Sequence, residues 1–212
     1  MVEMIYGAYA SYLPLILEDF SQRIRLKNDD VKRTTGYKLF EHFTARIKSP
    51  ESMVEKCHRK GLPVTTESAL KSIRDSIGLR IVCGFVDDIY ALVEMITAFE
   101  DCRIVAEKDY IKNAKPNGYR SYHLIVEVET PYPDCWGNEQ GRYFIEIQLR
   151  TIAMDSWASL EHQMKYKHDI KNPKRIVREL KRCADELASC DLTMQTIRNL
   201  IQENTPAKGE GQ

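Results

Sequence analysis

The fold is decided by the stretch Tyr143-Phe-Ile-Glu-Ile-Gln-Leu-Arg-Thr151, in which apolar and polar side chains alternate. Successive side chains of an extended segment point to opposite faces, so Glu146 and Gln148 share one face. The other face is apolar and carries Ile145, Ile147 and Leu149. We therefore predict a strand at Tyr143–Leu149, in a sheet with one face fit for a core and one face fit for a binding site.

A second informative stretch lies upstream and reads Asn117-Gly-Tyr-Arg-Ser-Tyr-His123. In an extended conformation Tyr119 and His123 share one side. An aromatic ring suits a nucleotide base, and the nearby Lys115 suits its phosphates. Tyr119 or His123 taken alone is more often a packing or structural residue, so the interpretation depends on their combination with Glu146. Together the two stretches predict a nucleotide site.

The remaining sequence predicts four more strands, at 43–48, 78–85, 103–109 and 121–129. An opening helix is marked by Leu13, Leu17, Phe20 and Ile24, and we expect it to end before the polar stretch 27–35. Pro50 opens a helix that ends at Gly61, and shorter helices are expected at 66–75 and 87–99. Strands that are both adjacent and separated by helices favour an α+β fold, with a mixed, mainly antiparallel five-stranded sheet flanked by helices.

The last helix carries a separate signal. Its apolar residues are spaced alternately by four and three: Ile176, Leu180, Cys183, Leu187, Cys190, Met194, Ile197 and Ile201. This narrow heptad seam packs either on the protein's own body or on another subunit, and both alternatives remain open. We expect an N-terminal helical segment at 1–35, one main domain at 36–168, a C-terminal oligomerisation helix at 169–204 and a disordered tail at 205–212.

Composition excludes some classes of partner. Lys and Arg total 31 and Asp and Glu total 31, so no global field draws the chain to nucleic acid or to an anionic membrane, and RNA binding would need a local patch. The six cysteines form no Cys-x-x-Cys pair, which fits reduced thiols. There is no apolar run of transmembrane length and no basic region of a signal peptide at the start. We expect a soluble, cytoplasmic protein with no membrane partner.

The helix that Pro50 opens suits phosphate. Ser52, Lys56 and Arg59 lie on one of its faces, and Arg46 and Lys48 lie on one side of the strand before it. Free N–H groups and the helix dipole at the N-terminus favour phosphate oxygens. A basic helical face is more often solvated surface, so this signal alone is weak.

Two carboxylates from distant sequence complete the candidate site. Asp75 precedes one predicted strand and Glu146 lies on another, and hard oxygen ligands of this kind suit magnesium. An isolated carboxylate more often closes a surface ion pair. Glu146 interrupts an apolar run, however, and a charge in that position needs a partner or a metal.

These residues, in this order, resemble the synthetase domain of the RelA/SpoT family, and more closely its stand-alone small alarmone synthetases. The resemblance covers about Phe43 to Lys167. It rests on four ordered motifs, which are Arg46-Ile-Lys-Ser-Pro-Glu-Ser52, Asp75-Ser-Ile-Gly-Leu-Arg80, Lys108-Asp-Tyr-Ile-Lys-Asn-Ala-Lys-Pro-Asn-Gly-Tyr-Arg-Ser-Tyr-His123 and Glu146-Ile-Gln-Leu-Arg-Thr151. It implies a nucleotidyltransferase-like domain that transfers the β,γ-pyrophosphate of ATP to the 3′-hydroxyl of GTP or GDP, releases AMP and lacks hydrolase activity.

The resemblance also implies a role for each residue and a homotetramer. ATP would be bound by Arg46, Lys48, Ser52, Lys56, Arg59 and Arg80, with the two arginines sandwiching the adenine and the others holding phosphates. GTP or GDP would be contacted by Lys108, Lys115, Tyr119, His123 and Gln148, with the tyrosine stacked on the guanine. Asp75 and Glu146 would be catalytic and bind Mg²⁺, and Glu146 would also take the proton of the attacking hydroxyl.

Two other functions stay open. A regulator that binds a nucleotide or RNA could keep this fold without catalysis, but the presence of Asp75 and Glu146 favours an enzyme. A toxin-type synthetase of the same family would modify the 3′ end of tRNA, and the neutral charge balance disfavours that substrate.

The chain departs from those tetrameric relatives that their own product stimulates. Such relatives bind the product through a Phe-x-Thr-Gly segment and an asparagine, and the corresponding residues here are His42, Thr44, Ala45 and Asp155. Ala45 adds a Cβ, and Asp155 places an anion beside a phosphorylated effector. We expect weak or absent product stimulation; the alternative is that Asp155 merely caps the helix that follows it.

Overall fold

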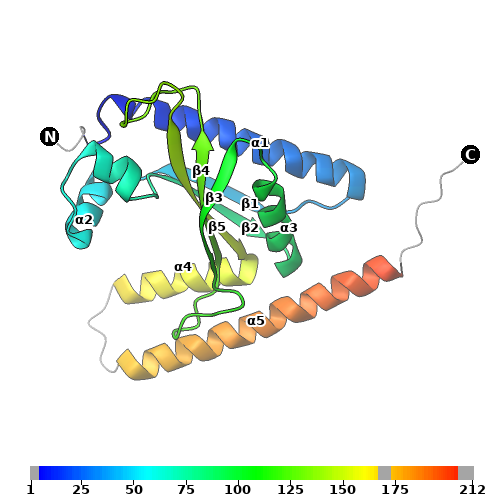
Figure 1. Ribbon diagram of the computed structural model, residues 1–212. Helices are drawn as coiled ribbons and strands as arrows, with labels where there is room; N and C mark the ends of the chain where they lie inside the picture. Colours follow the sequence, from blue (N-terminus) through cyan, green and yellow to red (C-terminus); the bar gives the residue numbers. More distant parts are fainter. Residues whose placement is uncertain (1–4, 167–172, 205–212) are drawn as a thin grey trace, which may run out of the picture.

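A five-stranded sheet organises the molecule. The computed structural model describes residues 5–166 and 173–204. Its strands are β1 (His42–Ile47), β2 (Ile77–Cys83), β3 (Cys102–Asp109), β4 (Tyr122–Glu129) and β5 (Arg142–Thr151), in the spatial order β1-β2-β5-β4-β3 (Figure 1). Strands β2 and β5 are parallel, and the other neighbouring pairs are antiparallel. This confirms the predicted mixed, mainly antiparallel sheet.

Helices surround the sheet. They are α1 (Tyr12–Thr35), α2 (Pro50–Lys60), α3 (Val86–Thr97), α4 (Ile152–Tyr166) and α5 (Pro173–Glu203), with a short 3₁₀ turn, η2 (Gly7–Tyr9), and a π-helical turn, η3 (Ser68–Ser72). The apolar face of the sheet and the buried side chains of α1 and α3 form one core. A second, small cluster of Trp157, Ala158, Leu180 and Ala184 joins α4 to α5, which run side by side below the sheet in Figure 1.

The prediction that the opening helix ends before the polar stretch 27–35 was wrong. Helix α1 continues to Thr35, and Gly36 ends it in the left-handed conformation (φ 79°), with its N–H bonded to the carbonyl of Lys32. Within the polar half, Asn28 is buried and its side-chain oxygen accepts the N–H of Leu39. The polar half is therefore helical because its contacts are polar, and apolar spacing does not detect such contacts.

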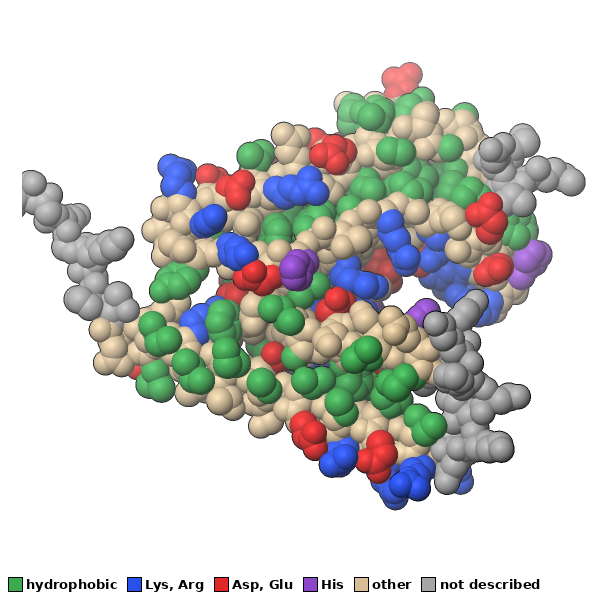
Figure 2. Space-filling view, turned by 180° about the vertical axis from the view of Figure 1, so that it is seen from behind, with side chains coloured by type: hydrophobic (Ala, Val, Ile, Leu, Met, Phe, Trp, Pro, Cys, Tyr) green, Lys and Arg blue, Asp and Glu red, His purple; other side chains and the backbone are tan. Residues whose placement is uncertain are grey.

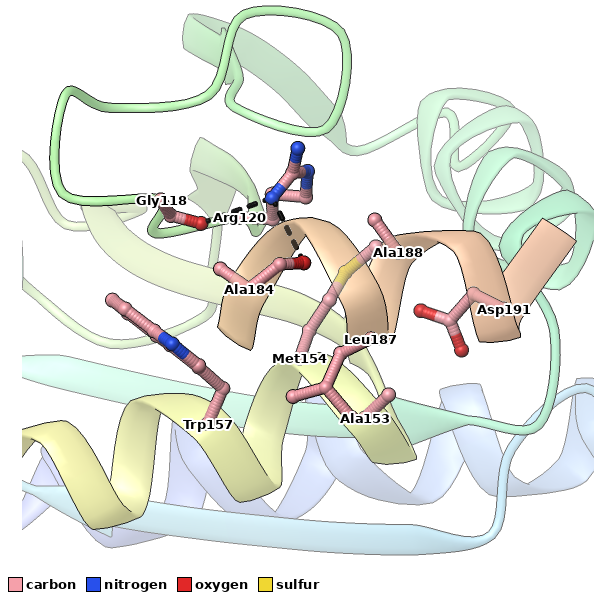
Figure 3. Close-up of a pocket in the computed structure, with 9 residues that line it drawn as sticks. All are labelled: Gly118, Arg120, Ala153, Met154, Trp157, Ala184, Leu187, Ala188 and Asp191. Carbon is pink, nitrogen blue, oxygen red and sulfur yellow. Dashed lines mark hydrogen bonds between the residues drawn. The ribbon is translucent and has the colours of Figure 1, made fainter. Parts of the chain in front are cut away.

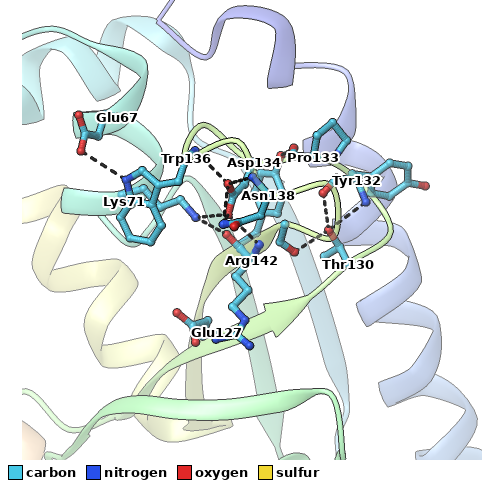
Figure 4. Close-up of polar contacts among 12 residues, drawn as sticks. Glu67, Lys71, Glu127, Thr130, Tyr132, Pro133, Asp134, Trp136, Asn138 and Arg142 are labelled. Carbon is cyan, nitrogen blue, oxygen red and sulfur yellow. Dashed lines mark hydrogen bonds and ion pairs between the residues drawn. The ribbon is translucent and has the colours of Figure 1, made fainter.

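A buried ion pair anchors the loop between β4 and β5 to η3 (Figure 4). Lys71 Nζ lies 2.8 Å from Oδ2 of Asp134, and the two side chains are 4% and 1% exposed. Asp134 also accepts the backbone N–H groups of Trp136 and Arg142, at 2.9 and 3.1 Å. Burial raises the pKa of Asp134, but the Lys71 ammonium and these donors outweigh it and hold the pKa well below its usual value. The pair fixes η3, which directly precedes the segment that carries Asp75.

The predicted seam on α5 divides into two parts. Leu180 is buried against α4, as is Ala184, which the heptad spacing did not include, and Leu187 is partly buried. The predicted seam residues Cys183 and Cys190 are exposed. Further along, Met194 and Ile197 are 50% and 45% exposed, and Figure 2 shows hydrophobic side chains gathered along this helix. The first half therefore packs on the protein's own body, and the second half presents apolar side chains at the surface.

The second half of α5 meets α3 through polar groups instead. Gln195 is buried and accepts the N–H of Asp87, and Arg198 forms a 2.6 Å ion pair with Asp88.

No helix of the described residues has the length and apolar character that crossing a membrane requires. The predicted tail at 205–212 and the predicted boundary at 168 and 169 lie outside the described residues.

Candidate active site

The strand register gathers six of the predicted site residues on one face of the sheet. One row crosses all five strands and consists of Thr44, Arg80, Gln148, His123 and Lys108. In the adjacent row, Arg46 lies opposite Gly78, which lies opposite Glu146. The cleft above these rows extends from Arg46 and Arg80 to Tyr119 and Arg150. Its wall on α4 is formed by Ala158, Ser159, Glu161, His162 and Gln163. Residues from distant motifs thus meet in one cleft.

The β1 side of the cleft is basic and holds a shared carboxylate. Oδ2 of Asp75 accepts from Lys56 Nζ at 2.5 Å and from Lys48 Nζ at 2.9 Å. Burial raises the pKa of Asp75, but the two lysines outweigh that effect and lower it below the usual value. Oδ1 of Asp75 has no hydrogen-bond partner among the described residues. This oxygen is buried, so Asp75 keeps an unused acceptor beneath the basic side of the site.

Helix α2 begins as the sequence predicts. Ser49 is its N-cap and accepts the N–H of Ser52, and Pro50 occupies the first turn. Ser52 and Arg59 are exposed, whereas Lys56 is half-buried because it reaches Asp75. The N-terminus of α2 thus opens beside the two lysines, where phosphate oxygens would find both N–H groups and positive charge.

Two arginines project from neighbouring antiparallel strands into the cleft. Arg46 on β1 lies opposite Gly78 on β2, and Gly78 precedes Arg80 by two residues. Both arginines line both pockets of the cleft. Burial and the nearby Arg150 lower the pKa of Arg80. Nε of Arg80 is buried and has no hydrogen-bond partner among residues 5–166 and 173–204. Two planar cations in this arrangement can flank a flat ring.

The β4 side of the cleft is aromatic. The hydroxyl of Tyr119 lies 2.8 Å from Nε2 of His123, and Lys115 Nζ lies 4.8 Å from the centre of the tyrosine ring. Burial, followed by the charges of Arg150, Lys115 and Lys108, lowers the pKa of His123 from 6.5 to about 4. His123 is therefore neutral at neutral pH and can accept as well as donate a hydrogen bond.

Sequence reasoning missed Arg150, which connects several of these groups. Its side chain is 6% exposed. It donates to Asp155 Oδ1 at 2.8 Å, to the Tyr119 hydroxyl at 2.9 Å and to Gln148 Oε1 at 3.1 Å. The alternation of the strand could have predicted this position. Arg150 follows Glu146 and Gln148 at the same two-residue spacing, so its side chain lies on the same face of the sheet.

Asp155 does not cap α4. Thr151 does so, since its hydroxyl oxygen accepts the N–H of Met154. The Asp155 carboxylate instead pairs with Arg150 and lies 3.7 Å from Arg80. The alternative interpretation of Asp155 is therefore wrong, and its charge belongs to the cleft.

Asp75 and Glu146 offer the carboxylate oxygens that Mg²⁺ prefers as ligands. The described residues contain no cluster of three or more His, Cys, Asp or Glu side chains that could hold a metal. Glu146 is half-buried and accepts from Gln148 Nε2 at 3.1 Å, and Asp75 has its unpartnered oxygen. Magnesium commonly takes one or two protein carboxylates and completes its shell with water and substrate phosphates, so this pair fits that ion.

Comparisons with known proteins agree with this geometry. Residues 45–171 match the family model described as the region found in RelA / SpoT proteins. The chain is 47% identical over 166 residues to the GTP pyrophosphokinase YwaC of Bacillus subtilis, which covers 78% of this chain and 77% of YwaC.

Two solved structures of small alarmone synthetase 1 from Bacillus subtilis are also similar. The structure bound to its product pppGpp has a TM-score of 0.77 at 33% identity, and the structure bound to AMPCPP has a TM-score of 0.71 at 30% identity. Each comparison covers 90% of this chain and 94% of the other. The family match spans more than half of the sequence, so the chain belongs to the RelA/SpoT family.

Proposed function

We propose that the chain is a GTP pyrophosphokinase, an enzyme that transfers the β,γ-pyrophosphate of ATP to the 3′-hydroxyl of GTP or GDP and releases AMP. The observation that carries this proposal is the row of side chains across the sheet, which joins a basic β1 side to an aromatic β4 side. The names of the relatives and their complexes with pppGpp and AMPCPP support it.

The basic side of the cleft binds ATP. Arg46 and Arg80 flank the adenine, because their planar cations line the same hollows. The phosphates lie at the N-terminus of α2, where Lys48, Ser52, Lys56 and Arg59 hold them. The two lysines share one oxygen of Asp75 and have further donors to offer to phosphate.

The aromatic side binds the acceptor nucleotide. Tyr119 stacks on the guanine, and Lys115, which already lies over the tyrosine ring, meets the acceptor phosphates. Neutral His123 and Gln148 contact the nucleotide from the strands, and Lys108 lies beside them in the register. These contacts align the 3′-hydroxyl with the ATP phosphates.

Chemistry takes place between the two sides, where Glu146 lies. Its carboxylate accepts the proton of the 3′-hydroxyl as the bond from that oxygen to the β-phosphorus forms and the bond from the β-phosphorus to the α-phosphate oxygen breaks. Asp75 and Glu146 would hold Mg²⁺, which neutralises charge on the transferred phosphates. Lys48 and Lys56 contribute charge of the same sign at the same place.

The wider proposal concerns assembly and location. The exposed apolar side chains on the second half of α5 are suited to a homotetramer of the kind that the resemblance implies. The six cysteines are unpaired, as expected for a cytoplasmic protein. Light scattering at micromolar concentration tests the tetramer, and a monomer would reject it. Leu192→Glu, on the exposed side of α5, should dissociate the assembly.

The test of function is a product assay with the pure protein, magnesium, labelled ATP and one of three acceptors: GTP, GDP or tRNA. AMP and a guanosine 3′-pyrophosphate are expected with GTP or GDP. Label transferred to tRNA would indicate the toxin-type activity. ADP and phosphate as the only products would reject pyrophosphate transfer, and the absence of any product would favour a regulator that only binds.

A further inference from the structure

The acceptor loop, residues 115–120, is docked on α5 by close backbone contact (Figure 3). Gly118 has a φ of 92°, a conformation that side chains disfavour. A Cβ at this position would lie 2.6 Å from Cβ of Ala184 and 3.0 Å from Cα of Lys181. The loop can therefore touch the helix because residue 118 has no side chain.

Arg120 fastens the same loop to the same helix. Its Nη1 donates to the carbonyl of Ala184 at 3.2 Å and also to the carbonyl of Gly118 at 3.2 Å. Its Nη2 donates to Asp185 Oδ1 at 3.0 Å. The Arg120 side chain is 18% exposed, so these charged hydrogen bonds are partly shielded from water.

Helix α5 is in turn fixed to the body of the protein beside the cleft. The indole N–H of Trp157 donates to the carbonyl of Leu180 at 2.9 Å, and Thr151 donates to Asp191 at 2.6 Å. The Trp157 ring centre lies 6.4 Å from that of Tyr119. The helix that holds the loop is thus itself fixed, and the loop carries the ring proposed to stack on guanine.

We propose that Gly118 and Arg120 are positioning residues that set acceptor affinity by docking the loop on α5. The docked loop presents Tyr119 and Lys115 to the acceptor nucleotide, so the placement of α5 determines how well GTP or GDP binds. ATP is unaffected, because its proposed ligands lie on β1, β2 and α2, whereas α5 packs on α4, α3 and this loop. This inference rests on the proposed function.

The matched variants are Arg120→Gln, Asp185→Asn and the control Arg182→Gln. Arg182 lies on the same helix, is exposed and pairs with Glu179 and Glu186, away from the loop. We expect the dissociation constant for GDP to rise about tenfold in the first two variants, as for the loss of a charged hydrogen bond, and that for AMPCPP to stay within about twofold. The control should match the unmodified protein for both ligands.

A double variant separates positioning from general damage. If Arg120 acts through Asp185, the double variant Arg120→Gln/Asp185→Asn should raise the dissociation constant for GDP by less than the product of the two single effects. Gly118→Ala should have the same selective effect for a steric reason. Equal weakening of GDP and AMPCPP, or unchanged GDP binding in both single variants, would overturn the inference.

A measurement without nucleotide tests the docking itself. The N–H of Gly118 is bonded to the carbonyl of Lys115, and the N–H of Lys115 to the carbonyl of Tyr119. Hydrogen exchange of these amides should accelerate in Arg120→Gln and Asp185→Asn and stay unchanged in Arg182→Gln. Faster exchange with unaltered GDP affinity would show that docking occurs but does not position the acceptor. Failure of the unmodified protein to bind any guanine nucleotide would instead refute the proposed function.

Discussion

Two aspartates in this molecule pair with lysines, and they differ in what else they bind. Asp134, 1% exposed, accepts from Lys71 and from backbone and side-chain N–H groups on both of its oxygens. Asp75, 10% exposed, accepts from Lys48 and Lys56 on one oxygen, and its other oxygen has no partner among the described residues. Both carboxylates have lowered pKa values, so that property does not separate them.

The difference shows how a structural ion pair and a binding site can be distinguished. A buried carboxylate with every oxygen bonded stabilises the fold and has no capacity left for a ligand. A carboxylate that leaves one oxygen unpartnered retains that capacity. We therefore assign the Lys71 pair to stability and the Asp75 cluster, with Glu146, to function.

Glu146→Gln should have the largest effect and sharpen this contrast. Loss of the proton acceptor should lower the rate by about two to four orders of magnitude, the range for general-base help, with little change in melting temperature. Initial rates of AMP formation measure it. Glu129→Gln, which alters an exposed carboxylate on the adjacent β4, is the control. A Glu146→Gln rate within threefold of the unmodified enzyme would remove Glu146 from the mechanism.

Lys71→Met should break the other side of the comparison. It leaves the buried Asp134 charge without its ammonium, and we expect about 3–5 kcal/mol less free energy of unfolding, with the rate per folded molecule retained. Urea denaturation and assays on the folded fraction measure both. Lys56→Met should instead lower the rate per folded molecule and leave the free energy of unfolding nearly unchanged, since Lys56 is only half-buried and lies beside the site. Similar stability losses in the two variants would contradict the assignment.

Acid should weaken the fold through His123. The unfolded chain takes up this proton near pH 6.5, whereas the folded protein resists it until about pH 4. Between those values the unfolded state binds more protons, so stability must fall as the pH falls from about 6.5 to about 4. Unfolding free energies across this range should decline less in His123→Gln than in His58→Gln, which alters an exposed histidine on α2. Parallel declines in the two variants would exclude His123 as the source.

Tyr119→Ala should weaken acceptor binding by about 1–3 kcal/mol, the value of one stacked base. The Michaelis constant for GTP or GDP should rise much more than that for ATP. Tyr119→Phe keeps the ring and loses the hydroxyl that contacts His123 and Arg150, so it should retain most of the affinity. Equal changes in the two Michaelis constants of Tyr119→Ala would argue against stacking on the guanine.

The smallest effect concerns Asp155, whose charge is already paired with Arg150 and Arg80. We expect weak or no stimulation of the unmodified enzyme by its product, because an anion at this position disfavours a phosphorylated effector. Asp155→Asn should increase stimulation by about fivefold, at the low end of typical allosteric coupling. Product titrations into initial-rate assays measure both, and strong activation of the unmodified enzyme would show the expectation to be wrong.

The strands could be predicted because each alternates between a core face and a polar face. Predicted and observed ends differ by at most two residues, as for 78–85 against Ile77–Cys83. The second half of α1 could not be predicted in this way, because its fixed points are the buried Asn28 and the left-handed Gly36. The sequence also did not show that the first half of the α5 seam is buried and the second half exposed, because this depends on which part of α5 packs against α4.

The site could be predicted from its motifs better than from single residues. Alternation placed Glu146 and Gln148 on one face, and the register confirmed that arrangement. The sequence did not indicate that Arg150 is buried or that it joins Asp155 to Tyr119. Nor did it indicate that the acceptor loop depends on α5, because that contact is made by backbone, by Ala184 and by a glycine.

The single parallel pairing in the sheet also bears on how the molecule folds. It joins β2 to β5 and pairs Ile77 with Ile145, the longest separation along the chain of any strand pairing in the sheet. Closing long loops is slow, so we expect this pairing to form late. Arg80 and Gln148 face each other across it. A chain still emerging from the ribosome therefore lacks a complete cleft until β5 has been made and has paired with β2.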